Sequence, residues 1–165
     1  MDKLQFARDL YAVHGLLPVP VAGKVPIGGT GWNLLDLDTR LRIATSNSCT
    51  GIGIQFGLIF HPVLGPVEAR CIDCDIDTPS QRDAFMATIN VNQWRWGRRP
   101  AMLVFTEPNI IRREKFGPVQ LLGAGKQAVW FGAYPTGDPP TYTWQGPSIF
   151  DRMPPHLPAA RLKHA

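Results

Sequence analysis

The chain has 165 residues, 44% of them hydrophobic and 18% charged, a balance that excludes an intrinsically disordered protein. This length fits one domain with a core large enough to fold unaided, and the formal net charge of +4 is compatible with a polyanionic partner without requiring one. No secretory signal pattern and no apolar run long enough to span a bilayer is present, so we expect no membrane partner. Sixteen glycines and sixteen prolines favour many short elements joined by turns.

Three cysteines, an odd number, do not make a complete disulfide framework. Cys71 and Cys74 have the C-x-x-C spacing of metal and redox motifs. Residues three apart on a strand point to opposite faces, however, and no second cysteine pair or nearby histidine completes a zinc set. We therefore predict structural cysteines and a cytoplasmic, reducing location.

In chain order, the first predicted element is a helix over residues 4–13, where apolar residues recur at helical spacing and Gly15 follows as a C-cap. The proline-interrupted apolar segment at 16–21 suits an edge strand. The loop at 23–32 is rich in glycine and carries Lys24. Such a loop can cradle phosphates, although it lacks the P-loop order, so a phosphate contact and an ordinary exposed lysine both stay open.

A short helix is predicted over residues 38–44, followed by a strand at 51–57 in which small and large residues alternate. This alternation is typical of a strand that another backbone approaches closely. The connection at 61–66 is short, so we expect this strand to form an antiparallel hairpin with the next one. His61 is interpreted as a loop residue and not as a metal ligand.

The most informative stretch is 67–77, which carries aspartates at alternate positions. With a period of two, Asp73, Asp75 and Asp77 lie on one face of a strand whose other face is apolar. Aspartate is a poor strand former, and neighbouring carboxylates repel one another. A divalent cation removes this cost, and Mg²⁺ commonly takes one or two carboxylates together with substrate phosphates. The stretch is either a metal site for a phosphate-bearing substrate or a solvated strand face or turn.

The Thr-Pro-Ser sequence at 78–80 predicts the start of a helix that ends near Asn92. Between 94 and 100, three arginines interleave with two tryptophans. Arginine and aromatic side chains together can hold phosphates and stack bases. The alternative is a connection whose solvated arginines pack over tryptophan.

Four more strands are predicted, at 101–105, 119–122, 127–131 and 142–144, with a turn between the second and the third. From Gly146 onward the chain is rich in proline and arginine without periodicity, so we expect a domain at 1–145 and a tail or linker at 146–165. These elements predict a single α+β domain with a largely antiparallel sheet and flanking helices.

Four groups of residues follow one another along this domain. They are Gly23-Lys24-Val25-Pro26 with Gly31-Trp32; Gly51-Ile52-Gly53-Ile54 with Gly57; Ile72-Asp73-Cys74-Asp75-Ile76; and Leu121-Leu122-Gly123 with Gly125-Lys126-Gln127, Phe131-Gly132-Ala133-Tyr134-Pro135 and Tyr142-Thr143-Trp144. In this order they resemble the N-terminal domain of bifunctional DNA primase–polymerases, the prim-pol branch of the archaeo-eukaryotic primase superfamily of phages and plasmids. The resemblance runs from the first helix to Trp144, and it depends on the order of the motifs because each is weak alone.

The resemblance implies a prim-pol fold with an RRM-like catalytic core, and nucleotidyl transfer assisted by Mg²⁺ or Mn²⁺. In that scheme Asp73 and Asp75 are the catalytic metal ligands, and Asp77 is an auxiliary ligand or the first residue of the next turn. The metal would activate the attacking hydroxyl and neutralise charge on the triphosphate. The implied partners are a single-stranded DNA template, nucleoside triphosphates and a replicative helicase, present as another domain or a separate protein. The candidates for binding phosphate are Lys24, Arg98, Arg99 and Lys126.

The chain departs from the family pattern at three positions. Residues 102–109 lack the histidine of the second motif, and Tyr134 stands where some relatives place one. Gln120 occupies the third-motif position, where the family has a metal-binding acid, and a neutral amide binds Mg²⁺ more weakly than a carboxylate. The site then uses two aspartates alone, recruits Asp77 or Glu107, or has lost polymerisation.

Three functions therefore stay open. The first is a DNA primase–polymerase domain that synthesises or extends primers on single-stranded DNA. The second is the same fold binding nucleic acid or nucleotide without polymerising. The third is a D-x-D metal-dependent enzyme acting on nucleotide-sugars or phosphoesters, which would need no template.

Overall fold

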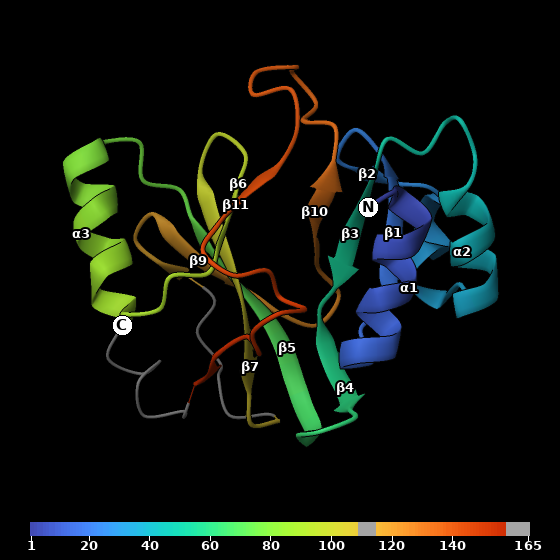
Figure 1. The fold of residues 1–165 in the computed structure, drawn as a ribbon, viewed down its shortest axis with the longest axis horizontal. Helices are drawn as coiled ribbons and strands as arrows, with labels where there is room; N and C mark the ends of the chain where they lie inside the picture. The colour runs from blue at the N-terminus through green and yellow to red at the C-terminus, as the bar shows by residue number, and fades with distance from the viewer. Residues whose placement is uncertain (109–114, 158–165) are drawn as a thin grey trace.

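Two β-sheets and three α-helices make up the part of the chain that the computed structural model describes, residues 1–108 and 115–157 (Figure 1). The first sheet has the strand order β10-β3-β1-β2, formed by Gln127–Gly132, Gly51–Gln55, Pro18–Ala22 and Val25–Pro26. The second has the order β11-β6-β7-β5-β9-β8, formed by Thr143–Gln145, Trp94–Trp96, Pro100–Thr106, Gly65–Cys74, Val119–Leu122 and Lys115–Phe116. The neighbours in both orders are antiparallel, which confirms the expected α+β class.

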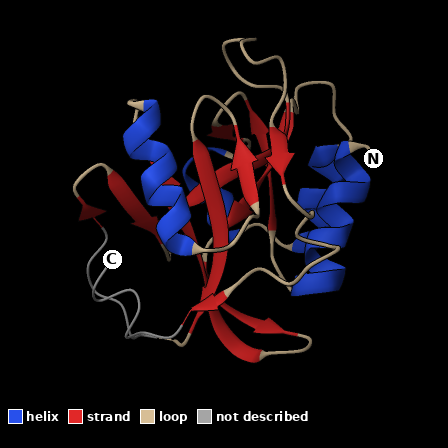
Figure 2. Ribbon diagram, turned by 60° about the vertical axis from the view of Figure 1, so that its left-hand side comes forward, coloured by secondary structure: helices blue, strands red, loops and turns tan. Residues whose placement is uncertain are grey.

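The helices lie on two sides of these sheets (Figures 1 and 2). They are α1 (Lys3–His14) and α2 (Leu37–Ala44) beside the first sheet, α3 (Pro79–Ile89) beside the second, and a short 3-10 helix, η1 (Gly29–Leu34). The N–H of Gln5 donates to the carboxylate of the N-cap Asp2 at 2.8 Å, and α1 ends at the predicted C-cap Gly15, whose φ is +69°. Within the described ranges, no helix is both long and apolar enough to cross a membrane.

The main hydrophobic core lies between α1 and the facing sides of both sheets. Phe6 and Leu10 of α1, Ile52 of β3 and Leu103 of β7 are each at most 1% exposed. A second cluster on the other face of the second sheet packs Met102 and its neighbours against α3. The second sheet is therefore covered on both faces, and β5 is one of its interior strands. The three cysteines are buried free thiols.

The alternation of small and large residues in β3 allows β10 to approach closely, as the sequence predicts. A Cβ on Gly51 would lie 2.5 Å from the carbonyl oxygen of Phe131. The predicted hairpin between β3 and the acidic strand is wrong, because β3 belongs to the first sheet. The hairpin partner of β5 is β4 (Gly57–His61), a separate strand. It begins at Gly57, whose φ of +128° suits glycine and lets the chain change sheet.

The strands predicted at 119–122 and 127–131 both form, but they do not pair with each other. β9 lies in the second sheet and β10 in the first, so the turn between them is another crossover. The two crossovers lie against each other, since a Cβ on Gly57 would be 3.4 Å from the Cα of Ala124. Two of the connections between the sheets therefore lie side by side, and a third runs from β10 to β11.

Residues 146–157, expected to begin a tail or linker, lie against the domain. Ile149 is 5% exposed within the main core. β12 (His156–Leu157) adds to β7 as a parallel strand. Residues 158–165, the rest of the expected tail, are outside the described residues.

A pair of buried histidines ties this segment to α1. His61, interpreted from the sequence as a loop residue, is 2% exposed at the end of β4. Its Nδ1 accepts the N–H groups of Val63 and Leu64 at 3.0 and 3.2 Å, so its Nε2 carries the proton and donates to His14 Nδ1 at 2.9 Å. His14 Nε2 then donates to the carbonyl of Ile149 at 2.7 Å. Both rings are neutral in this arrangement, and each ring nitrogen has a hydrogen-bond partner.

Candidate functional site

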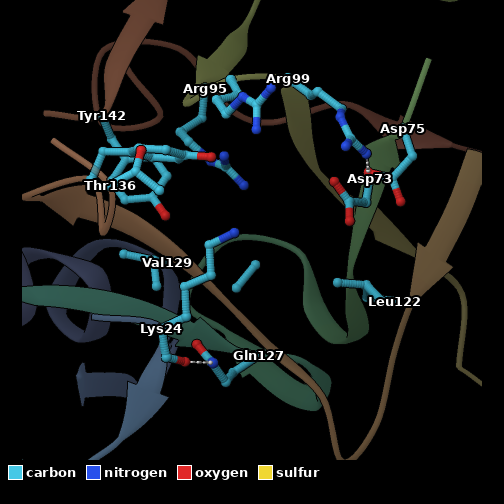
Figure 3. A pocket seen from close by; sticks show the side chains of 13 residues that line it. Lys24, Asp73, Asp75, Arg95, Arg99, Leu122, Gln127, Val129, Thr136 and Tyr142 are labelled. Carbon is cyan, nitrogen blue, oxygen red and sulfur yellow. Dashed lines mark hydrogen bonds and ion pairs between the residues drawn. The ribbon is translucent and has the colours of Figure 1, made fainter. Parts of the chain in front are cut away.

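A cleft of about 400 Å³ opens between the first sheet and the C-terminal end of β5 (Figure 3). Its wall combines segments that are far apart in the sequence: the loop after β1, the end of β5, β6 and the turn after it, and β10 with the loop that follows. The charged residues that line the cleft are Lys24, Asp73, Asp75, Arg95, Arg98 and Arg99. The site therefore presents carboxylates and cations to one space.

Asp73 is the last but one residue of β5, where the strand pairs with Ala101 of β7 on one side and Gln120 of β9 on the other. Burial, and then the neighbouring Asp75, raise the pKa of Asp73, although Arg95 and other cations oppose the shift. Asp73 has no ion-pair partner among the described residues. A partly desolvated carboxylate beside a second carboxylate is costly, and a bound cation would relieve that cost.

Asp75 and Asp77 lie beyond the end of β5, so the acidic strand is shorter than the sequence predicts. Arg99 reaches both of them: its Nη1 lies 2.9 Å from Asp75 Oδ1 and its Nε lies 3.0 Å from Asp77 Oδ1. The pKa of Arg99 is raised, since these carboxylates outweigh the opposing effect of burial. Asp77 does not line the cleft, and its side chain is 79% exposed. The site proper therefore holds two of the three expected aspartates.

The donor set fits a cation that completes its coordination with substrate oxygens. Among the described residues no three acidic, histidine or cysteine side chains converge as a ready metal site. Asp73 and Asp75 are sufficient for Mg²⁺ or Mn²⁺ when phosphates and water supply the remaining ligands. Glu107 cannot join them, because the register of β5 and β7 places it at the opposite end of the sheet, about 20 Å away.

Gln120, the expected position of a third acid, is paired with Asp73 across β9 and β5. Directly paired residues share a face of the sheet, so the Gln120 side chain projects to the same side as Asp73. Gln120 is half-buried and does not itself line the cleft. Gln120 lines instead the apolar cavity beside α3.

Of the four cations expected to bind phosphate, three line the cleft: Lys24, Arg98 and Arg99. The fourth, Lys126, is exposed on the turn between β9 and β10 and does not line it. The carbonyl of Lys24 accepts a hydrogen bond from Gln127 Nε2 at 3.2 Å, which ties its loop to β10. Its ammonium lies 5.5 Å from the centre of the Tyr134 ring, and Figure 3 shows it pointing into the cleft.

Arg95 is a cleft residue that the sequence analysis did not select. It is 9% exposed, and its guanidinium carbon lies 5.2 Å from the ring centre of Trp130 and 4.9 Å from that of Tyr142. The signal for it was the alternation in β6: Trp94 faces the cluster under α3, so Arg95 must point to the opposite face. Arg95 therefore joins the expected cations that line the cleft.

Two tyrosines close the end of the cleft beside Arg95. The rings of Tyr134 and Tyr142 meet edge to face with their centres 5.3 Å apart. A Cβ on Gly97 would lie 2.6 Å from the Tyr134 ring, so this packing requires glycine in the turn between β6 and β7. Burial raises the pKa of Tyr142, while Arg95 opposes that shift.

Comparisons with protein-family models, curated proteins and solved structures give no match to this chain.

Proposed function

We propose that this domain is a prim-pol-type DNA primase–polymerase, which synthesises or extends primers on single-stranded DNA with Mg²⁺ or Mn²⁺. The observation that carries the proposal is the cleft itself. Asp73 and Asp75 lie at the end of β5, Arg95 lies two strands away on the same sheet, and Lys24 approaches the same space from the other sheet (Figure 3). Paired carboxylates facing cations are what nucleotidyl transfer needs, because the substrate brings both a metal and a polyphosphate.

The chain's own residues have distinct tasks in this scheme. Asp73 and Asp75 would hold the cation, which when bound would activate the attacking hydroxyl and neutralise charge on the triphosphate. Asp75 must first exchange its contact with Arg99. Arg99 would then have its charge available for a phosphate oxygen at the edge of the cleft.

The resemblance to prim-pols gains support from positions that are distant in sequence and near in space. Lys24 of the first motif, the aspartates of the D-x-D motif and Tyr134 of the last motif all line one cleft. Gln120 at the third-motif position is paired with Asp73. We propose that the second sheet with α3 corresponds to the RRM-like core of this family. We further propose that the domain works in phage or plasmid replication beside a helicase.

The decisive experiment measures incorporation of labelled nucleotides on single-stranded DNA with Mg²⁺ or Mn²⁺. Product that requires both metal and template supports the proposal. DNA or nucleotide binding that persists with chelator and gives no product would favour a non-polymerising member of the fold. Turnover of a nucleotide-sugar or phosphoester without template would favour a D-x-D enzyme of another class.

Gln120→Glu is expected to raise incorporation several-fold at limiting Mg²⁺, because it places a charged oxygen on the same face as Asp73. It should also lower thermal stability in chelator, since three carboxylates then repel one another, and Mn²⁺ should restore that stability. Initial rates across a Mg²⁺ titration and melting curves with and without Mn²⁺ check both effects.

The matched control for this prediction is Gln81→Glu, which makes the same change on the exposed surface of α3. If Gln120→Glu is no more active than Gln81→Glu across the titration, Gln120 is not a degenerate ligand position.

A further inference from the structure

Arg95 differs from the other buried arginines of the described chain in having no acceptor for its charge. Arg40 is 1% exposed and donates to the carbonyl oxygens of Leu35, Pro18 and Trp32 and to Gln55 Oε1. Arg70 is 5% exposed and lies 2.9 Å from Glu68 Oε1. Arg95 is 9% exposed, makes no ion pair or hydrogen bond with a described residue, and has a buried Nε without a partner. Arg40 and Arg70 therefore each have an acceptor for their charge, and Arg95 has none within hydrogen-bond or ion-pair distance among the described residues.

Aromatic packing alone does not explain a charged side chain at this position. Trp130 and Tyr142 hold the guanidinium between them, and such contacts contribute about 1–2 kcal/mol when desolvated. Burying a cation without a hydrogen-bonded anion costs several kcal/mol. A neutral side chain between the two rings would avoid that cost. The guanidinium charge is thus available to an anionic group that enters the cleft.

The position of Arg95 indicates the sign and the class of that group. Arg95 and Lys24 line the same cleft, and Lys24 also has no ion-pair partner among the described residues. Arg99, by contrast, already contacts Asp75 and Asp77. An anion that enters the metal-free protein therefore meets positive charge without an ion-pair partner at the buried Arg95, at Lys24 and at the exposed Arg98. Separate cations suit a ligand with several linked charges, such as a polyphosphate chain.

We infer that Arg95, with Lys24, forms an anion site that binds the polyphosphate chain of a nucleotide without needing a divalent metal. That the anion belongs to a nucleotide rests on the proposed function; the anion site itself rests on the unpaired, aromatic-bounded Arg95. The nucleotide would thus be anchored by its phosphates. Arg95 would be a positioning residue on the same sheet as Asp73, since both are paired with Ala101 from opposite sides.

The test is calorimetric titration of the full chain with inorganic tripolyphosphate in EDTA at low salt, repeated with dATP and with deoxyadenosine. Tripolyphosphate and dATP are expected to bind, and deoxyadenosine to bind far more weakly. Arg95→Gln should weaken tripolyphosphate binding by about tenfold or more, the loss expected for charge-assisted hydrogen bonds. Lys126→Gln removes the same charge outside the cleft and should change the affinity by no more than about twofold, since exposed distant charges are screened.

Circular dichroism and melting curves establish that each variant is folded. If Arg95→Gln does not fold, Arg95→Lys decides: it keeps the charge but loses the planar fork, and about threefold or more weakening is expected. No binding by the parent in EDTA would overturn the inference. Parent-like affinity in a folded Arg95→Gln would also overturn it, and so would equal weakening by Lys126→Gln. Where only Arg95→Lys folds, parent-like affinity in Arg95→Lys would overturn it. The titration contains neither metal nor template, so its outcome is independent of whether the protein polymerises.

Discussion

Asp73→Asn is expected to lower metal-dependent nucleotide incorporation by about a hundredfold or more, while the protein stays at least as stable as the parent. The loss of activity follows because Asn removes one of the two carboxylates that line the cleft. A hundredfold corresponds to a barrier higher by about 2.7 kcal/mol, a typical magnitude for removing one preorganised electrostatic contact. Asp75→Asn should have a similar effect on incorporation.

The expected gain or retention of stability follows from the direction of the Asp73 pKa shift. Burial and Asp75 raise that pKa, so the folded state disfavours the ionised carboxylate. Asp73 therefore makes the fold less stable as the pH rises from the ordinary aspartate range through its raised folded pKa. Asn has no such ionisation and removes the penalty at neutral pH. Melting curves in EDTA between pH 4 and pH 8, beside the incorporation assay, measure both effects.

Asp83→Asn is the matched control, because Asp83 is an exposed aspartate on α3 outside the cleft. It should keep parental activity. If Asp73→Asn remained active, the proposed site would be wrong. If it unfolded while Asp83→Asn stayed folded, Asp73 would be a structural residue.

The second large effect is expected in acid, where the free energy of unfolding should fall by about 1–3 kcal/mol between pH 7.5 and pH 5. This magnitude is the cost of leaving buried hydrogen-bonding groups unsatisfied. Burial lowers the pKa of His14, and burial followed by the charge of His14 lowers that of His61. Below the ordinary histidine pKa the unfolded chain then binds more protons than the folded one. This contribution to stability is therefore present above about pH 6.5 and is lost as the pH falls toward the lowered pKa values of the folded state.

The hydrogen bonds explain why protonation is unfavourable here. A proton on His61 Nδ1 would face the N–H groups of Val63 and Leu64, and a proton on His14 Nδ1 would face the N–H of His61. The bond from His14 Nε2 to the carbonyl of Ile149 favours the protonated ring, but burial outweighs it. Urea denaturation across this pH range gives the slope, and hydrogen exchange of residues 146–157 shows whether the segment is released first.

The double variant His14→Gln/His61→Asn offers non-titrating groups that can replace the outer hydrogen bonds of the pair. Its stability should change less with pH than that of the parent. His156→Gln, which removes an exposed histidine on β12, should leave the parental slope unchanged. A double variant with the full parental slope would exclude this pair as the source of acid sensitivity.

Local pattern was sufficient to predict most strands and all three α-helices, because periodicity and capping residues are properties of neighbouring positions. It did not assign strands to sheets. The alternation in β3 indicates a close neighbour but not that this neighbour is β10. Likewise, the short turn after β9 is compatible with a hairpin and with the crossover that the structure contains. Sheet membership depends on contacts between distant segments, which period and turn chemistry do not specify.

In the candidate site, too, local pattern predicted some residues, and contacts between distant segments decided the others. Asp73 and Asp75 could be predicted because their spacing is itself the signal, and Lys24 because of its glycine loop. Arg95 was considered only as one of the three arginines between 94 and 100 and was not named as a phosphate-binding candidate, since nothing local showed that the face opposite Trp94 was a cleft. Lys126 is placed outside the cleft because the turn that carries it leads from one sheet to the other.

The adjacent crossovers at Gly57 and Ala124 have a mechanical consequence. Asp73 belongs to one sheet and Lys24 extends from the other, and one hydrophobic core packs against both sheets. The crossovers and this core hold the two sides of the cleft in place before a ligand enters. A ligand that contacts both sides therefore loses little free energy in organising them.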